Sequence, residues 1–209
     1  MFTQKSKKVL LFAILLISLF GFNLNKSEAQ CPTGWSFQNF IININGCNYS
    51  VNVCYKCAPT ALDATEFDIL SPLDPINPSC TQTWTEDQVI NYAYNQVRQR
   101  IYLTSLCEAR PCDQTPKSRI KFVQYACWEY YRDSNGNLHL QACVNDAKCE
   151  VEYEVCNNGS ALEWTIFSTN WVASTTPTCS YPNSTIPIPQ DNNTSSGCYR
   201  ISTPCDTQE

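Results

Sequence analysis

The chain has 209 residues, 14 of which are cysteine, and a formal net charge of −5 at pH 7. The acidic balance argues against a protein of the kind that binds nucleic acid or an anionic membrane surface, because such binding depends largely on Lys and Arg contacts to phosphates. A single histidine also leaves little basis for histidine-dependent catalysis.

The N-terminus has the pattern of an export signal. An apolar run over residues 9–22 follows several lysines, and small residues at Ser27 and Ala29 fit a signal-peptidase site. The run is shorter than the ~20 residues that a membrane-spanning helix needs, which disfavours an uncleaved anchor. We therefore predict a signal peptide over residues 1–29 and a secreted or cell-surface protein with no membrane contact after cleavage.

All cysteines follow the predicted signal peptide. An even number of cysteines in an exported chain predicts a disulfide framework, here of about seven bridges. The expected half-cystines are Cys31, Cys47, Cys54, Cys57, Cys80, Cys107, Cys112, Cys127, Cys143, Cys149, Cys156, Cys179, Cys198 and Cys205. A zinc or redox site at Cys54 and Cys57 is disfavoured, because this single C-x-x-C motif ends a predicted strand and does not begin a helix. No cofactor is expected.

Two segments, residues 47–54 and 149–156, begin and end with cysteine and alternate like strands in between. Residues seven positions apart on a strand point to opposite faces, so the two cysteines of one segment cannot bond to each other. Each of these strands is therefore predicted to be linked to other elements on both of its faces.

The dipeptide Asn45-Gly46 predicts the first hairpin. A type I′ turn needs positive φ at both central residues, and Asn-Gly is the strongest signal for it. The resulting register pairs Ile44 with Cys47, Ile42 with Tyr49, and Phe40 with Val51. One face of the hairpin is then continuously apolar and is expected to lie on the core.

The middle of the chain is expected to be irregular and then helical. Four prolines break residues 58–80, where one short strand is predicted over residues 67–70. Residues 85–106 have apolar side chains at helical spacing, and Thr85 with Gln88 makes a capping box at the start. The predicted core stripe consists of Val89, Ile90, Ala93, Tyr94, Val97 and Ile101.

The dipeptide Asn135-Gly136 predicts a second hairpin. It joins a strand around residues 120–132 to a strand over residues 138–143. The register places His139 opposite Arg132, just after the turn. His139 is therefore expected at the surface, without a catalytic role.

Three aromatic residues of this hairpin are weak candidates for ligand binding. Trp128, Tyr130 and Tyr131 could form a platform for sugar rings, since aromatic residues are common in recognition surfaces. Strand aromatics also pack across strands, and this is the plainer interpretation.

The dipeptide Asn158-Gly159 predicts a third hairpin. Its register pairs Val155 with Leu162, Tyr153 with Trp164, and Val151 with Ile166. The other face then carries Glu150, Glu152, Glu154 and Glu163, with Glu154 opposite Glu163. Such carboxylates are weak candidates for calcium ligands or for acid–base work on a glycosidic bond. A solvated acidic face is the plainer interpretation.

These elements predict a mainly β (α+β) fold in which disulfide-stapled antiparallel hairpins pack with one principal helix. The disulfide-rich domain is expected over residues 30–173, with its helix near residues 85–106. Residues 174–209 are rich in Ser, Thr, Asn and Pro and are expected to form a tail that cysteines tie back.

Two short segments resemble a group of secreted Cys-rich bacterial proteins. The segments are Cys31-Pro32-Thr33-Gly34-Trp35 and Cys54-Tyr55-Lys56-Cys57. The group shares a Cys-Pro-x-Gly-Trp start and a Cys-Tyr-Lys-Cys strand end. The resemblance implies an exported bacterial module and implies no activity, cofactor or catalytic residue.

The sequence therefore predicts a secreted module with a structural or interaction role and no catalytic residues. Its partner would be an extracellular protein or glycan, or a second copy in a surface assembly, and not nucleic acid. Two alternatives stay open. One is a secreted carboxylate-dependent hydrolase, and the other is an exported inhibitor or effector.

Overall fold

The computed structural model describes residues 31–77, 79–80, 84–143, 146–172, 178–180 and 186–207. The predicted signal peptide lies outside the described residues. Cys31–Glu209 form one compact unit, which includes the described parts of the predicted tail. In the part of the chain that the structure describes, no helix is long and apolar enough to cross a bilayer.

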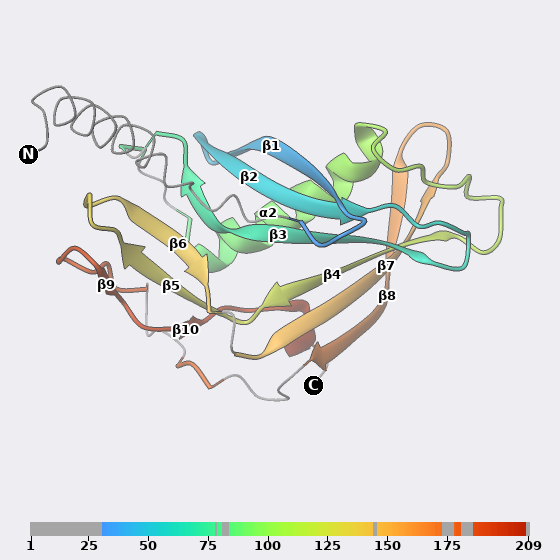
Figure 1. The fold of residues 1–209 in the computed structure, drawn as a ribbon. Coiled ribbons are helices and arrows are strands. Elements are labelled where there is room, and N and C mark those ends of the chain that lie inside the picture. Colours follow the sequence, from blue (N-terminus) through green and yellow to red (C-terminus); the bar gives the residue numbers. More distant parts are fainter. Residues whose placement is uncertain are drawn as a thin grey trace, which may run out of the picture. The chain divides into compact units, whose positions relative to one another are not determined.

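The larger of two sheets has six strands in the order β1-β2-β3-β4-β7-β8 (Figure 1). Its strands are β1 (Ser36–Ile44), β2 (Cys47–Lys56), β3 (Ala64–Pro75), β4 (Ser118–Tyr125), β7 (Lys148–Asn157) and β8 (Leu162–Val172). Neighbouring strands are antiparallel except β3 and β4, which are parallel. The helix lies in the connection between these two strands, as parallel neighbours require a long crossover.

The smaller sheet has the order β10-β5-β6, with β9 also pairing with β5. Its strands are β5 (Cys127–Arg132), β6 (Leu138–Ala142), β9 (Thr194–Ser195) and β10 (Tyr199–Arg200), and the 3₁₀-helix η1 (Pro204–Thr207) follows. The two short strands come from the predicted tail, so part of that tail belongs to the folded sheet.

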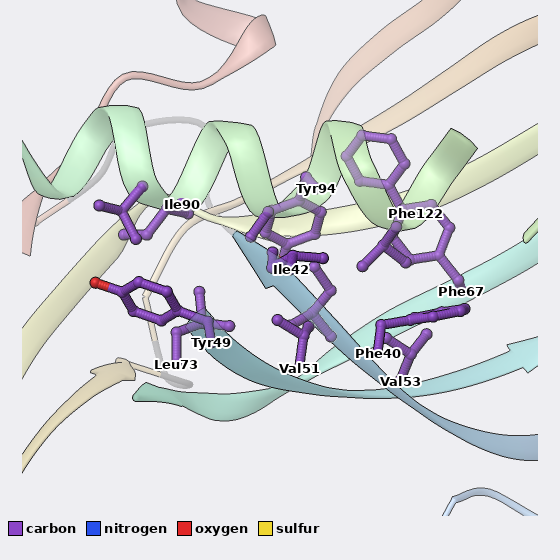
Figure 2. Close-up of a cluster of buried hydrophobic side chains, with 14 of the residues drawn as sticks. Phe40, Ile42, Tyr49, Val51, Val53, Phe67, Leu73, Ile90, Tyr94 and Phe122 are labelled. Atoms are coloured by element: carbon purple, nitrogen blue, oxygen red, sulfur yellow. The ribbon is translucent and has the colours of Figure 1, made fainter. Parts of the chain in front are cut away.

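Helix α2 (Glu86–Leu103) begins at Thr85 with the predicted capping box. The Thr85 hydroxyl accepts a hydrogen bond from the Gln88 amide, and the Gln88 side chain accepts one from the Thr85 amide at 3.0 Å. All six predicted stripe residues are buried. Figure 2 shows Ile90 and Tyr94 of the helix facing Ile42 of the sheet. The predicted apolar face of the helix is confirmed as a core face.

The first hairpin has the predicted register. Ile44 pairs with Cys47 and the inward-facing side chains of both strands are buried. Asn45 and Gly46 both have positive φ, at 48° and 86°, as a type I′ turn requires.

The third hairpin differs from the prediction by two residues. Val155 pairs with Trp164, and not with Leu162. The reason is a four-residue loop in which the Asn158 side-chain oxygen accepts hydrogen bonds from the amides of Ser160 and Ala161, both at 2.9 Å. As far as Tyr153 the shift by two keeps the faces and changes the cross-strand partners. Beyond the irregularity between Glu152 and Tyr153 the difference is three residues, and Val151 pairs with Thr169, not with Ile166.

The predicted long strand over residues 120–132 is wrong. It divides at Ala126, which is fully buried, donates its N–H to the Ala147 carbonyl and accepts a hydrogen bond from the Ile201 N–H. The first part becomes β4 of the larger sheet and the second part becomes β5 of the smaller sheet. The short strand expected over residues 67–70 is also longer, since β3 covers Ala64–Pro75.

All 14 cysteines form disulfides. The pairs are Cys31–Cys54, Cys47–Cys80, Cys57–Cys107, Cys112–Cys156, Cys127–Cys179, Cys143–Cys198 and Cys149–Cys205. The two cysteines of β2 bond to different elements, as do those of β7, which confirms the prediction for both strands. The last three bridges tie the predicted tail to β5, to the end of β6 and to β7.

Candidate functional site

The aromatic candidates do not form a platform. Trp128 is 0 % exposed and its indole N–H donates to the Tyr125 carbonyl at 3.0 Å. Tyr130 packs against the same core, and Tyr131 is half-buried beside His139 with the ring centroids 6.4 Å apart. Trp128 is therefore out of reach of a sugar ring, and the cross-strand packing interpretation holds for it.

The predicted pairing of Glu154 with Glu163 is wrong. Glu154 pairs with Thr165 across the hairpin, and Glu163 lies opposite Cys156. The Glu163 carboxylate accepts a hydrogen bond from Asn158 at 2.8 Å. The like-charge contact that motivated both the calcium site and the carboxylate hydrolase is therefore not formed.

The other two glutamates of the stripe are paired with β4. Glu150 forms a salt bridge with Lys121 at 2.8 Å, and Glu152 forms one with Arg119 at 3.0 Å. The hydrogen bond that the Lys121 ammonium donates to Glu150 raises the pKa of Lys121. Glu150 and Glu152 are therefore each neutralised by a base on β4.

Three carboxylates lie beside disulfides. Glu163 is within 4.8 Å of both sulfurs of Cys112–Cys156, and Asp146 and Glu129 are placed in the same way beside the bridges of Cys127 and Cys143. A cysteine sulfur binds a metal as a thiolate, and these sulfurs are bonded to each other in disulfides. In the described parts of the chain these groups therefore do not provide a thiolate metal site.

His139 connects the two sheets. Its Nδ1 lies 2.6 Å from an Asp74 carboxylate oxygen and its Nε2 lies 3.4 Å from Asp133. Its cross-strand neighbour is Tyr131, and not Arg132 as predicted, because the turn has five residues. The expectation of a simple surface histidine is wrong, since only 26 % of its side chain is exposed.

His139 and the two carboxylates beside it shift one another's pKa values. Burial lowers the pKa of His139, but its hydrogen bonds and charge contacts with Asp74 and Asp133 outweigh burial and raise the pKa overall. Burial raises the pKa of Asp74. Hydrogen bonds from Asn137 and neighbouring groups lower the pKa of Asp133 to about 2. The arrangement is a charged link between β3 and β6.

A pocket of about 330 Å³ lies beside the Cys57–Cys107 disulfide. Asp63, Glu108 and Arg110 contribute charges to its wall. Part of this set is already engaged, since Arg110 donates to the Pro116 carbonyl at 2.6 Å and Asp63 accepts from a threonine hydroxyl. No residue singled out in the sequence as a ligand-binding candidate lines this pocket.

The most distinctive surface is the outward face of the first hairpin, which we call the neutral patch. It consists of Phe37, Asn39, Ile41 and Asn43 on β1 and Asn48, Ser50 and Asn52 on β2. None of these side chains is charged, in a chain with a net charge of −5. Phe37 and Ile41 are each 56 % exposed.

Hydrogen bonds order the polar side chains of the neutral patch. The Asn39 amide donates to the Ser50 hydroxyl at 2.7 Å and to the Asn52 side-chain oxygen at 2.8 Å. Asn43 donates to Asn48 across the strands at 2.9 Å. These amides are therefore held in place before any partner arrives.

Sequence reasoning found the inward face of this hairpin and missed the outward one. The signal was present, because every second residue from Phe37 to Asn43 is Phe, Asn or Ile. What could not be seen is that nothing in the described chain covers these residues while the face behind them packs under α2.

Comparisons with family models, with curated proteins and with solved structures gave no match.

Proposed function

We propose that this protein is a secreted, non-catalytic interaction module, and that the neutral patch is the surface through which it meets its partner. The observation that carries the proposal is the patch itself, an uncharged and exposed hairpin face with pre-ordered side-chain amides in an acidic chain. Its partner is an extracellular protein or glycan that presents an uncharged surface to the patch.

Physical chemistry supports this use of the patch. Removing charges from water is costly, so an uncharged surface can be covered at a lower desolvation cost than the salt-bridged half of the sheet. The exposed parts of Phe37 and Ile41 add apolar area that burial would stabilise. Side chains that are already ordered lose less entropy on binding.

The disulfide framework supports the same role. Cys31–Cys54 and Cys47–Cys80 attach opposite faces of β2 to the rest of the chain, so the hairpin is anchored at both ends. A rigid, stapled surface suits recognition outside the cell, where disulfides persist.

The test is a binding assay with two charged variants. The secreted protein is applied to an array of immobilised neutral and acidic oligosaccharides, and its self-association is measured in the same preparation. Asn52→Lys places a charge in the neutral patch, and Thr165→Lys places the same charge on exposed β8 of the same sheet. We expect Asn52→Lys to weaken the observed binding by ~10-fold or more and Thr165→Lys to leave it unchanged.

Two outcomes would contradict the proposal. Equal binding by the wild type and Asn52→Lys would show that the neutral patch does not contact the partner. Cleavage of a glycan that is lost in Glu154→Gln would instead support the carboxylate hydrolase. The inhibitor alternative would be supported by tight binding to a protease that Asn52→Lys does not weaken.

A further inference from the structure

Strand β1 is an edge of the six-stranded sheet. Among the described residues it pairs only with β2, so its other side is an open ladder of backbone groups. Monomeric proteins protect such edges with charged residues, prolines, bulges or very short strands. The nine residues of β1, SFQNFIINI, contain no charge, proline or glycine, and the pairing with β2 is free of bulges.

The open backbone groups belong to the residues of the neutral patch. Ile44 and Cys47 flank the two-residue turn, and in an antiparallel hairpin such a pair is hydrogen-bonded. Hydrogen-bonded and non-hydrogen-bonded pairs then alternate along β1. The outward N–H and C=O groups are therefore those of Phe37, Asn39, Ile41 and Asn43.

We propose that β1 pairs with β1 of a second copy of this chain, in antiparallel register with Asn39 opposite Asn39. This inference rests on the proposed function and names the partner of the neutral patch. In that register Phe37 of each copy lies opposite Ile41 of the other copy. Cross-strand pairs of large apolar side chains stabilise a sheet, and each copy would contribute one half of two such pairs.

The central pair extends a ladder that already exists. Asn39 is hydrogen-bonded to Asn52 within one copy, so the two-fold pairing would place four asparagines in a row across two hairpins. The Gln38 side chain donates to the Asn39 carbonyl at 3.0 Å. A carbonyl oxygen has two lone pairs, so it can accept a second hydrogen bond from the other copy.

The opposite edge of the sheet is a poorer template. Strand β8 has an irregularity in its pairing with β7 between Glu152 and Tyr153, next to Phe167. A bulge disrupts the ladder and increases local twist, which are devices that protect edges. Strand β8 also carries the charged residue Glu163 and is in contact with η1.

Charge agrees with pairing through β1. Two acidic copies repel each other, and a contact made by an uncharged strand adds no further repulsion. Salt screens the remaining repulsion between the copies, so dimerisation should strengthen as salt is raised. Because an edge contact covers less area than a standard interface, we expect a dimer in the micromolar range.

The test is sedimentation of the secreted protein from about 1 µM to about 1 mM. Asn48-Tyr49-Ser50 has the N-x-S pattern of a glycosylation acceptor, so the protein is prepared in a host that does not glycosylate Asn48. Ile41→Lys places a charge on the edge strand opposite Phe37 of the other copy. Asn39→Pro removes an outward N–H and leaves the ladder to β2 intact. Thr165→Lys on β8 is the matched control. Far-UV circular dichroism verifies that each variant is folded.

We expect the wild type and Thr165→Lys to pass from monomer to dimer, and both β1 variants to weaken dimerisation by ~10-fold or more. The register has its own readout, because Asn39→Cys should form a covalent dimer and Asn43→Cys should not. A wild type that stays monomeric would overturn self-pairing, and so would multimers that only Thr165→Lys abolishes. Oligosaccharide binding that Asn52→Lys weakens would leave the proposed function standing in either case.

Discussion

Replacing Trp128 with alanine tests the assignment of this residue to the core. Its side chain is 0 % exposed, so the change leaves a large cavity and leaves the Tyr125 carbonyl without its indole donor. Truncating a buried tryptophan costs about 3–5 kcal/mol of unfolding free energy, and the lost hydrogen bond accounts for about 1 kcal/mol of it. For a chain of this size, the melting temperature should fall by roughly 10 °C.

The assay is urea unfolding followed by far-UV circular dichroism, with the disulfides intact so that refolding can be verified. Trp128→Phe keeps a ring but removes the N–H donor, and it should lose about 1–2 kcal/mol. Tyr131→Ala, at a half-buried position of the same strand, should lose less than Trp128→Ala. The reasoning would be refuted if Trp128→Ala were as stable as Tyr131→Ala. A platform residue would instead affect ligand binding and leave stability unchanged.

Three further results are expected. Because the pKa of His139 is raised, the contribution of its charged form to stability is complete below about pH 6.5 and is lost as the pH rises through the higher folded pKa. Urea unfolding at a series of pH values should show this loss of stability. His139→Gln should abolish this part of the pH dependence. Millimolar calcium should shift the melting temperature by less than about 1 °C, since Lys121 and Arg119 occupy Glu150 and Glu152; a clear rise would revive the calcium site. The intact mass should lie about 14 Da below that of the reduced chain, two hydrogens for each of the seven disulfides, and free thiols would contradict the pairing.

The sequence by itself determined the features that depend on neighbouring residues. Asn45-Gly46 forces a tight turn through positive φ, and the turn then sets the register of its hairpin. Thr85 and Gln88 cap the helix from three residues apart. Strand alternation showed that the two cysteines of β2, and likewise those of β7, point to opposite faces and must bond to other elements. Such features follow from local geometry, so no knowledge of distant contacts is needed.

Only the tertiary structure decided the features that depend on distant residues. The continuous strand pattern around Ala126 gave no sign of a break, which exists because Ala147 and Ile201 bond to its backbone. The burial of Trp128 depends on where β5 goes after that break. The hairpin has a four-residue loop that Asn158 stabilises, so Glu163 does not lie opposite Glu154 as a two-residue turn would place it.

The tertiary structure also determines which cysteines pair and that β1 lies at an edge of the sheet. Fourteen cysteines permit many pairings, and local spacing excludes only a few of them. The residues of the neutral patch can be seen in the sequence. The edge position of their strand cannot, because a strand becomes an edge only when the order of all six strands is set.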